Sequence, residues 1–376
     1  MGDNNKNILL ILLVLSFLLS LLTIFVVAEG GIPTVSARSS VLYEPVSGTF
    51  ILEKDAHTQL PMASTTKIMT ALLAIERLDL DEVVTVPAEA TGIEGSSVYL
   101  KENDELTVRA LVYSVLLQSA NDAATALALI VSGDIKSFAD EMNARAKEIG
   151  LCDTNFENPH GLDSENHYTT AHDLALLAAE ALKNGQFKEI CSTFKYSFNI
   201  SEGKRTVVNH NKMLKRYDGA TGVKTGYTDK SGRCLVSSAE RNGITMIAVT
   251  LNAPNDWQDH TKMLDYGFES YEAVQLSKIT ATEYKIPVTG GKSDWVTVGT
   301  SAKGCTIPHK IGAVALRAEV DVPSSLSAPL NVGDTVGKIT VYDGEKAIAT
   351  FDLTASEAVE EEKRNVNIYD FLKNLF

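Results

Sequence analysis

The stretch MASTTKIMT, residues 62–70, sets a serine and a lysine three positions apart where a helix is expected to begin. Pro61 precedes it, and apolar residues follow at the period of a helix with one buried face. These apolar residues are Ile68, Ala71, Leu72, Ile75 and Leu78. On such a helix the side chains of Ser64 and Lys67 share one face. We therefore expect the fold to be organised around this helix.

Ser64 and Lys67 are candidates for a nucleophile and its base. A serine hydroxyl needs a neighbouring base, and a lysine can be that base only when burial or another cation keeps it neutral. The same spacing recurs at two other places, Ser192 to Lys195 and Ser201 to Lys204. Taken alone, the pattern favours a polar helix start over a catalytic pair.

The 376-residue chain is long enough for two domains and a sizeable core. Its 44% hydrophobic and 22% charged residues are ordinary for a globular protein. Its formal net charge of −14 argues against binding to a phosphate backbone, which requires a basic surface. We therefore expect no nucleic acid among its partners.

Residues 1–28 have the pattern of an export signal. Lys6 precedes an apolar run, residues 8–28, that ends in the small-residue sequence VVA. Cleavage after Ala28 is expected, but about 20 apolar residues also suffice to span a bilayer, so an uncleaved N-terminal anchor is the alternative. In either case the rest of the chain is expected to be exported to the cell envelope, at the outer face of the cytoplasmic membrane.

The four cysteines, Cys152, Cys191, Cys234 and Cys305, lie far apart and match no zinc-binding pattern. Export would permit disulfides, but free buried thiols are an equally open interpretation. The seven histidines show no His-Glu-x-x-His or related ligand spacing. We therefore expect no catalytic metal and no cofactor.

The chain before residue 273 mixes strand and helix patterns. The strongest hairpin signal is the Asn-Gly pair at 242–243, which lies between two β-prone runs. Strand-like runs are expected at 40–44, 49–53, 194–198, 206–208, 234–240 and 245–251, and short strands alternating with glycine-containing turns are expected over 85–99. Helical periodicity predicts helices over 107–118, 123–131, 137–150, 170–183 and 258–270.

The composition changes after residue 273. Helical periodicity disappears over 274–353, where proline and glycine separate short β-like runs. These runs are 295–298, 313–320, 338–342 and 347–353. We therefore expect a larger domain at 37–273, followed by a small all-β domain at 274–353.

The last segment, residues 356–376, is acidic up to Glu362 and then amphipathic. Its apolar residues fall on one helical face and have basic residues nearby. The apolar positions are Ile368, Phe371, Leu372, Leu375 and Phe376. In an exported protein this pattern favours a helix at the membrane surface, with a helix packed back on the protein as the alternative.

Two later stretches give the Ser64 and Lys67 pair more weight. The sequence SAN at 119–121 lies between two apolar helices, and KTG at 224–226 occurs once, directly before a β-hairpin. Each has an ordinary structural explanation, a cap or turn for the first and a strand glycine for the second. In this order along the chain, the three motifs together are a strong signal for one site.

With these motifs the sequence resembles the low-molecular-mass penicillin-binding proteins, the serine D-alanyl-D-alanine carboxypeptidases of the penicillin-binding protein 5 type, over residues 37–353. The supporting stretches are ARSSVLYE at 37–44, PMASTTK at 61–67, NPHGL at 158–162 and DGATGVKTG at 218–226. The resemblance implies an α+β fold. A β-lactamase/transpeptidase-like domain, with an antiparallel sheet, helices and an all-helical subdomain, would precede the small all-β domain.

The resemblance also implies catalytic roles. Ser64 would attack the carbonyl of the penultimate D-alanine of a peptidoglycan stem peptide, and neutral Lys67 would take its proton. Ser119 would relay that proton to the departing D-alanine. The positive charge of Lys224 would help to keep Lys67 neutral. Ser192 and Ser201 match nothing catalytic in this family, and Ser192 lies in an aromatic strand-like run.

The same resemblance implies the substrate contacts. Asn121 would hold the peptide amide, and Lys224 and Thr225, with Gly226 beside them, would bind the terminal carboxylate. Backbone N–H groups of Ser64 and Tyr227 would form the oxyanion hole. β-Lactam antibiotics would act as covalent inhibitors.

Two positions depart from the family pattern. Residues 209–212 read NHNK, so His210 stands where relatives often carry an arginine, and carboxylate recognition would be weaker or shared with Lys212. Tyr227 is bulky and would reshape the pocket. His160 is expected to be a structural loop residue, because Lys67 already serves as the base.

Three other functions are weighed against this one. A class A β-lactamase would need a deacylating glutamate, and neither Glu157 nor Glu165 has a Leu-Asn pair at the expected offset. An endopeptidase acting on peptide crosslinks would differ only in its substrate. A non-catalytic wall-binding or sensor protein would keep the fold, but the three intact motifs argue against it.

Overall fold

The computed structural model describes residues 31–201 and 203–362. The chain divides after Thr34 into two units, and the described part of the first, residues 31–34, contains no helix or strand. The expected export signal at 1–28 and the apolar part of the expected tail helix, 363–376, lie outside the described residues. Within those residues no helix is both long and apolar enough to cross a membrane.

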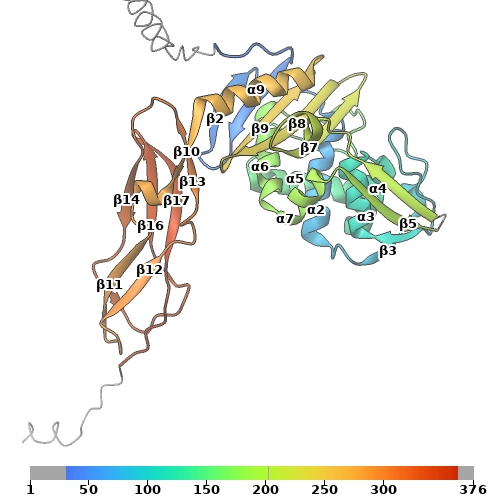
Figure 1. Ribbon diagram of the computed structural model, residues 1–376. Helices are drawn as coiled ribbons and strands as arrows, with labels where there is room; N and C mark the ends of the chain where they lie inside the picture. The colour runs from blue at the N-terminus through green and yellow to red at the C-terminus, as the bar shows by residue number, and fades with distance from the viewer. Residues whose placement is uncertain (1–30, 202, 363–376) are drawn as a thin grey trace, which may run out of the picture. The chain divides into compact units, whose positions relative to one another are not determined.

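The second unit contains a five-stranded antiparallel sheet in the order β2-β1-β9-β8-β7 (Figure 1). Its strands are β1 Ser39–Glu44, β2 Thr49–Lys54, β7 Ala220–Thr228, β8 Gly232–Arg241 and β9 Ile244–Leu251. The hairpin predicted at 242–243 is confirmed, because β8 pairs with β9. The strand-like runs predicted at 40–44 and 49–53 are β1 and β2, which also pair with each other. Asn242 and Gly243 adopt positive φ in the turn between β8 and β9, which this residue pair does at low cost. β7 forms one edge of the sheet.

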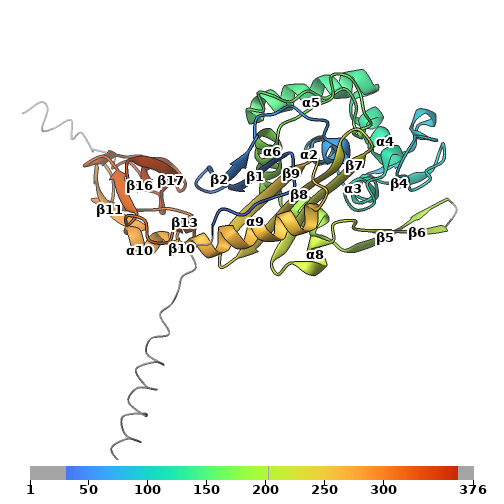
Figure 2. The same cartoon turned by 90° about the horizontal axis from the view of Figure 1, so that it is seen from above.

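Helices cover both faces of this sheet. On one face α9, Asp256–Ser270, packs against β8 and β9 (Figure 2). On the other face α6, Ala171–Lys183, packs against β1 and β9 and joins the larger apolar core. The other helices of that core are α2 Lys67–Arg77, α3 Val108–Leu117, α4 Asn121–Ser132, α5 Ile135–Ile149 and α7 Gly185–Ser192. The predicted α+β class is confirmed.

Side-chain caps explain where several helices begin. The hydroxyl of Thr107 accepts a hydrogen bond from the backbone N–H of Ala110 at the start of α3. Thr170 does the same for Asp173 at the start of α6. Such caps satisfy N–H groups that have no partner within the helix, which is why both predicted starts are close to the observed ones. α5 ends at Gly150, which has a φ of 90°, as predicted.

The sequence patterns do not predict α7, and the placement of Ser192 in a strand-like run is wrong. Ser192 is the last residue of α7. The side chain of Asn184 accepts hydrogen bonds from the N–H groups of Gln186 and Phe187. An Asn-Gly pair that resembles a turn therefore starts a short helix here.

Two small antiparallel strand pairs accompany the helical core. They are β3 Val83–Thr85 with β4 Glu105–Thr107, and β5 Lys195–Ile200 with β6 Gly203–Val208. The short helix α8, Met213–Arg216, follows β6. Of the short strands and turns predicted over 85–99, the strands are wrong beyond Thr85, because the chain there forms the single turn η2, Ala88–Ala90, and a loop held by side-chain hydrogen bonds.

After α9 the chain forms the predicted all-β region. It contains a six-stranded sheet in the order β14-β16-β17-β12-β11-β15 and a separate β10–β13 pair. The strands are β10 Tyr271–Gln275, β11 Glu283–Thr289, β12 Trp295–Gly299, β13 Thr306–Lys310, β14 Arg317–Asp321, β15 Leu326–Ser327, β16 Thr335–Asp343 and β17 Lys346–Ala355. A short helix, α10 Leu276–Ile279, interrupts this pattern. β14 begins later than predicted, and Gly312, with a φ of 80°, lies in the turn before it.

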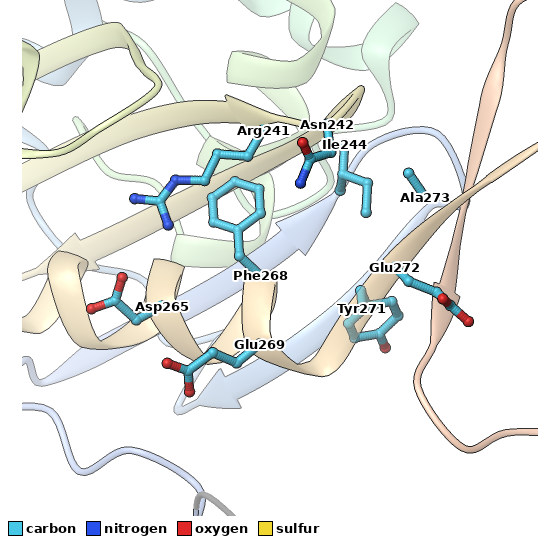
Figure 3. A pocket seen from close by; sticks show the side chains of 9 residues that line it. All are labelled: Arg241, Asn242, Ile244, Asp265, Phe268, Glu269, Tyr271, Glu272 and Ala273. Atoms are coloured by element: carbon cyan, nitrogen blue, oxygen red, sulfur yellow. The ribbon is translucent and has the colours of Figure 1, made fainter. Parts of the chain in front are cut away.

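A cavity of about 460 Å³ lies where α9 leads into β10 (Figure 3). The guanidinium carbon of Arg241 lies 4.9 Å from the centre of the Phe268 ring. The carboxylates of Asp265, Glu269 and Glu272 also line this cavity. None of the predicted site residues lines it, so the site lies elsewhere.

Candidate active site

Ser64 lies in the 3-10 turn η1, Ala63–Thr66, directly before α2. The hydroxyl of Thr65 donates to the carbonyl of Met62 at 2.6 Å, and the hydroxyl of Thr66 donates to that of Ala63 at 2.8 Å. A Cβ atom on Gly161 would lie 1.9 Å from the Ala63 carbonyl oxygen, so the loop around Gly161 packs directly on the turn. Internal hydrogen bonds and this loop together fix the serine beside Lys67.

Lys67 is fully buried and contacts three oxygen atoms. Its Nζ lies 2.6 Å from Asn121 Oδ1, 2.5 Å from the His160 carbonyl oxygen and 3.0 Å from Ser64 Oγ. The amide of Asn121 has a fixed orientation, because its Nδ2 donates to the Glu94 carbonyl. Two of the three oxygens can therefore only accept. A neutral amine has two N–H donors for them, which leaves its lone pair for the Ser64 hydroxyl to donate to.

Burial and a second lysine keep this amine neutral. Burial is the larger cause that lowers the pKa of Lys67 well below its usual range, and the positive charge of Lys224 lowers it further. The negative charge of Asp122 acts in the opposite direction. Burial also lowers the pKa of Lys224, to about 7. Lys67 therefore has the protonation state that a general base requires.

The second predicted motif lies between α3 and α4. Ser119 adopts a positive φ of 61° in this connection and lines the same cavity as Ser64. Asn121 is the first residue of α4 and is buried, with its side chain on Lys67 rather than in the cavity. The motif therefore supplies one hydroxyl to the cavity and one amide oxygen to the base.

Asp122 follows this motif and was not predicted as a site residue. Its buried carboxylate accepts hydrogen bonds from the Ser97 hydroxyl and from the N–H groups of Val98 and Leu100. The loop it holds includes Ser96, which lines the cavity. An acidic residue in the first turn of α4 was the available sequence signal, but acidic residues are common at helix starts.

The third motif lies on the edge strand β7. A Cβ atom on Gly226 would lie 3.0 Å from the backbone nitrogen of Ser64, so the glycine lets β7 approach the turn more closely than a side chain would without a shift. Lys224 is 1% exposed and its Nζ donates to the Thr225 carbonyl at 2.8 Å. Tyr227 is 62% exposed, and its hydroxyl donates to Asp229 at 2.9 Å. Its ring therefore lies at the rim.

One cavity of about 350 Å³ gathers these elements. The predicted residues that line it are Ser64, Ser119, His210, Thr225, Gly226 and Tyr227. Lys212, which the sequence suggested as a partner in carboxylate recognition, also lines it, and the lining residues that were not predicted are Ser96, Arg233, Asp256 and Trp257. Lys67, Asn121 and Lys224 are buried and are not part of this lining. Burial and then the charge of Lys224 lower the pKa of His210, so its ring is neutral.

The other two serine–lysine patterns lie elsewhere in the described structure. Ser192 donates to the Glu189 carbonyl at the end of α7, and Ser201 donates to Asp104 in the turn after β5. All four cysteines are free, and burial raises the pKa of Cys191 to about 12 and that of Cys234 to about 11. Among the described residues no cluster of histidine, cysteine, aspartate or glutamate could hold a metal ion.

Two protein families match this chain. The family described as D-alanyl-D-alanine carboxypeptidase matches residues 27–255. The C-terminal domain of penicillin-binding protein 5 matches residues 271–361. Together these matches span the α+β and the all-β parts of the fold.

Curated proteins and solved structures agree with these matches. The D-alanyl-D-alanine carboxypeptidase DacF of Bacillus subtilis is 33% identical over 335 residues, which is 86% of this chain and 86% of DacF. DacC of Escherichia coli is 34% identical over 360 residues, 92% of this chain and 89% of DacC. Penicillin-binding protein 5 from Haemophilus influenzae superposes with a TM-score of 0.68 at 28% identity, covering 88% of this chain and 99% of its own. The Streptomyces K15 DD-transpeptidase gives 0.60 at 34% identity, over 63% of this chain and 98% of its own.

Proposed function

This chain belongs to the D-alanyl-D-alanine carboxypeptidase family, and on that basis we propose that it removes the terminal D-alanine from peptidoglycan stem peptides ending in D-Ala-D-Ala. The observation that carries the proposal is the environment of Lys67. Two acceptors that cannot donate, Asn121 Oδ1 and the His160 carbonyl, lie on its Nζ, and Ser64 Oγ lies 3.0 Å away. In the neutral amine those two acceptors take both N–H groups, and the lone pair can accept the Ser64 proton. This is the arrangement in which a lysine activates a serine.

The first chemical step forms an acyl-enzyme. Ser64 Oγ attacks the carbonyl carbon between the two D-alanines, and its proton passes to Lys67 Nζ. An ester bond forms, the C–N bond to the terminal D-alanine breaks, and the leaving amine takes up the proton through Ser119. In the second step water attacks the ester. The shortened stem peptide then leaves with a new carboxylate, and Ser64 regains its proton.

The proposed substrate contacts come from residues that line the cavity, whereas the buried residues behind it act on Lys67. The N–H groups of Ser64 and Tyr227 are proposed to hold the oxyanion, because Gly226 brings β7 against η1. Thr225 lies on the cavity side and would contact the terminal carboxylate, with His210 nearby as a neutral donor. Lys224 and Asn121 would act from behind the cavity, through the charge and the orientation of Lys67.

Labelling with a fluorescent penicillin tests the proposal. The wild-type protein should be labelled covalently and should release D-alanine from a D-Ala-D-Ala peptide, and Ser64→Ala should do neither. Ser192→Ala is the matched control, because it removes the serine of another Ser-x-x-Lys pattern and should leave labelling unchanged. A wild-type protein that is not labelled, or a Ser64→Ala protein that still is, would refute the mechanism.

The penicillin adduct should be long-lived. Deacylation by a class A β-lactamase requires a glutamate that activates water. Here the loop after the second motif offers Lys67 a main-chain oxygen, that of His160, and the carboxylate of Glu157 is bound by Ser164 and Asn166 instead. Rapid turnover of penicillin would contradict this expectation.

We also propose that the protein acts outside the cytoplasm at the membrane surface. The supporting observations are the apolar run in residues 8–28 and the amphipathic pattern in residues 363–376. A chain that ends at Ala355 should show less partition to membranes than the full chain. Unchanged partition would leave the N-terminal segment as the anchor.

A further inference from the structure

One guanidinium lines the cavity that contains Ser64. Arg233 lies on β8 directly opposite Tyr227 of β7, and its side chain is 42% exposed. Lys212 is the second cation in the lining and Asp256 the one acidic residue. The charged lining is therefore net positive, although the whole chain has a formal charge of −14. A positive cavity in an acidic protein favours an anionic ligand.

The register of β7 and β8 shows which motif residues share a face with Arg233. Side chains alternate between the faces of a strand, so Thr225 and Tyr227 lie on one face and Lys224 on the other. Thr225 pairs with Leu235, which belongs to the core beneath α9, and Lys224 pairs with Val236, which belongs to the core of the other helices. Arg233 is therefore on the Thr225 face.

Lys224 is poorly placed to neutralise a ligand in this cavity. It is 1% exposed, and its Nζ donates to the main chain at Thr225. It also faces the side of the sheet on which Lys67 lies. A terminal carboxylate bound beside Thr225 would therefore meet the guanidinium of Arg233 before it met Lys224.

The surroundings of Arg233 hold it in position without using all its donors. One terminal nitrogen lies 2.9 Å from Asp256 Oδ2, and that carboxylate is buried at the start of α9. The guanidinium carbon also lies 5.8 Å from the centre of the Trp257 ring. A guanidinium has five N–H donors, so the ion pair leaves donors for a second, planar anion.

We infer that Arg233 is the charged group that selects a free terminal carboxylate, with the Thr225 hydroxyl beside it. The inference rests on the proposed carboxypeptidase function, because it assigns the ligand of that same cavity. Segment 209–212 has His210 where relatives often carry an arginine, and Arg233 would supply a guanidinium from β8 instead. Lys224 then serves the base and Arg233 serves the substrate.

Two peptides that differ only at the C-terminus test this inference. Both end in D-Ala-D-Ala, one with a free carboxylate and the other with a carboxamide, and kcat/KM is measured for each. Arg233→Gln should lower the ratio of carboxylate to carboxamide cleavage by about 30-fold, as expected for loss of a charge-assisted hydrogen-bonded pair. Arg233→Lys should recover part of the ratio, because it keeps the charge but loses the planar fork.

Two further variants separate substrate binding from a structural role. Lys230→Gln removes an exposed cation from the β7–β8 turn, outside the cavity lining, and should keep the wild-type ratio. Arg241→Gln removes another guanidinium of β8, one that lies over the Phe268 ring and outside this cavity lining, so it should keep the ratio even if it lowers the melting temperature. If Arg233→Gln keeps the wild-type ratio, or if Arg241→Gln loses it equally, Arg233 is not the selecting group.

The role of Arg233 in binding the carboxylate can also be measured without catalysis. In the Ser64→Ala background, calorimetry with the carboxylate peptide should show binding that Arg233→Gln weakens by about 30-fold. The carboxamide peptide should bind equally to both proteins. Failure of D-alanine release by the wild type would refute the proposed function, whereas equal binding of the carboxylate peptide with and without Arg233 would refute only this inference.

Discussion

Lys67 takes its reactive state from atoms that belong to three separate segments. Asn121 Oδ1 and the His160 carbonyl accept its two N–H groups, and burial removes the water that would otherwise stabilise its charged form. The sequence suggested both causes, burial and the positive charge of Lys224, without ranking them. In the structure burial is the larger cause and Lys224 the second.

Removal of the charge of Lys224 should change the pH dependence of acylation. Without that cation the pKa of Lys67 rises, so a higher pH is needed to deprotonate the base. Lys224→Met should therefore move the acidic limb of the penicillin acylation rate to higher pH and slow acylation near neutral pH. The measurement is the second-order acylation rate constant across the pH range.

Lys230→Met is the matched control for this prediction. It removes a cation that is exposed to solvent, where water and salt screen its charge. It should leave the acidic limb in place. If Lys224→Met weakens substrate binding but does not move the limb, the electrostatic link between the two lysines is wrong.

At the scale of elements, the site depends on how closely β7 approaches η1. Gly226, the residue after Lys224 and Thr225 on β7, lies against the backbone of Ser64. The two N–H groups proposed for the oxyanion therefore come from two different elements, the turn before α2 and the edge strand of the sheet.

Gly226→Ala should separate these elements. The added methyl group would lie 3.0 Å from the Ser64 nitrogen and 3.1 Å from the Ala63 Cβ, so the strand or the turn must shift. We expect acylation by penicillin to slow by about 100-fold, the usual effect of losing one oxyanion donor. Gly304→Ala adds the same group where nothing lies within 4 Å, and it should have no effect. Normal acylation by Gly226→Ala would contradict the proposed oxyanion hole.

The elements that the sequence predicts well are those with a local signal. The hairpins, the capped helices and the spacing of Ser64 and Lys67 depend on residues within one or two turns of each other. Arg233 and Trp257 could not be found in this way. They join the cavity only through the register of β8 with β7 and the start of α9. Asp122 was missed because its partners lie in a separate loop.

At the scale of the whole molecule, α9 is joined to the sheet by a buried histidine. His260 of α9 lies between the hydroxyls of Ser237 on β8 and Thr250 on β9, and it is fully buried. Burial lowers its pKa to about 3. The unfolded chain binds a proton at this histidine below about pH 6.5, whereas the native state does not. Stability from this group is therefore lost as the pH falls from 6.5 toward 3.

The free energy of unfolding should show this loss. Because of His260 alone, it should fall by roughly 1.4 kcal/mol per pH unit below pH 6.5. His260→Gln cannot take up the proton, so its unfolding free energy in urea should decline less steeply than that of the wild type. Equal slopes between pH 6.5 and pH 5 would mean that His260 does not control the acid sensitivity of the α9–sheet contact.

The close approach of β7 to η1 has a consequence for how the protein can be assayed. Ser64 comes from an early part of the chain and Gly226 from a late part, with most of the helical core between them in sequence. Neither segment can form the oxyanion site until the intervening chain has folded. Only native molecules should therefore be labelled covalently by penicillin. The intensity of the dye-labelled gel band should then be proportional to the amount of folded protein in a crude extract.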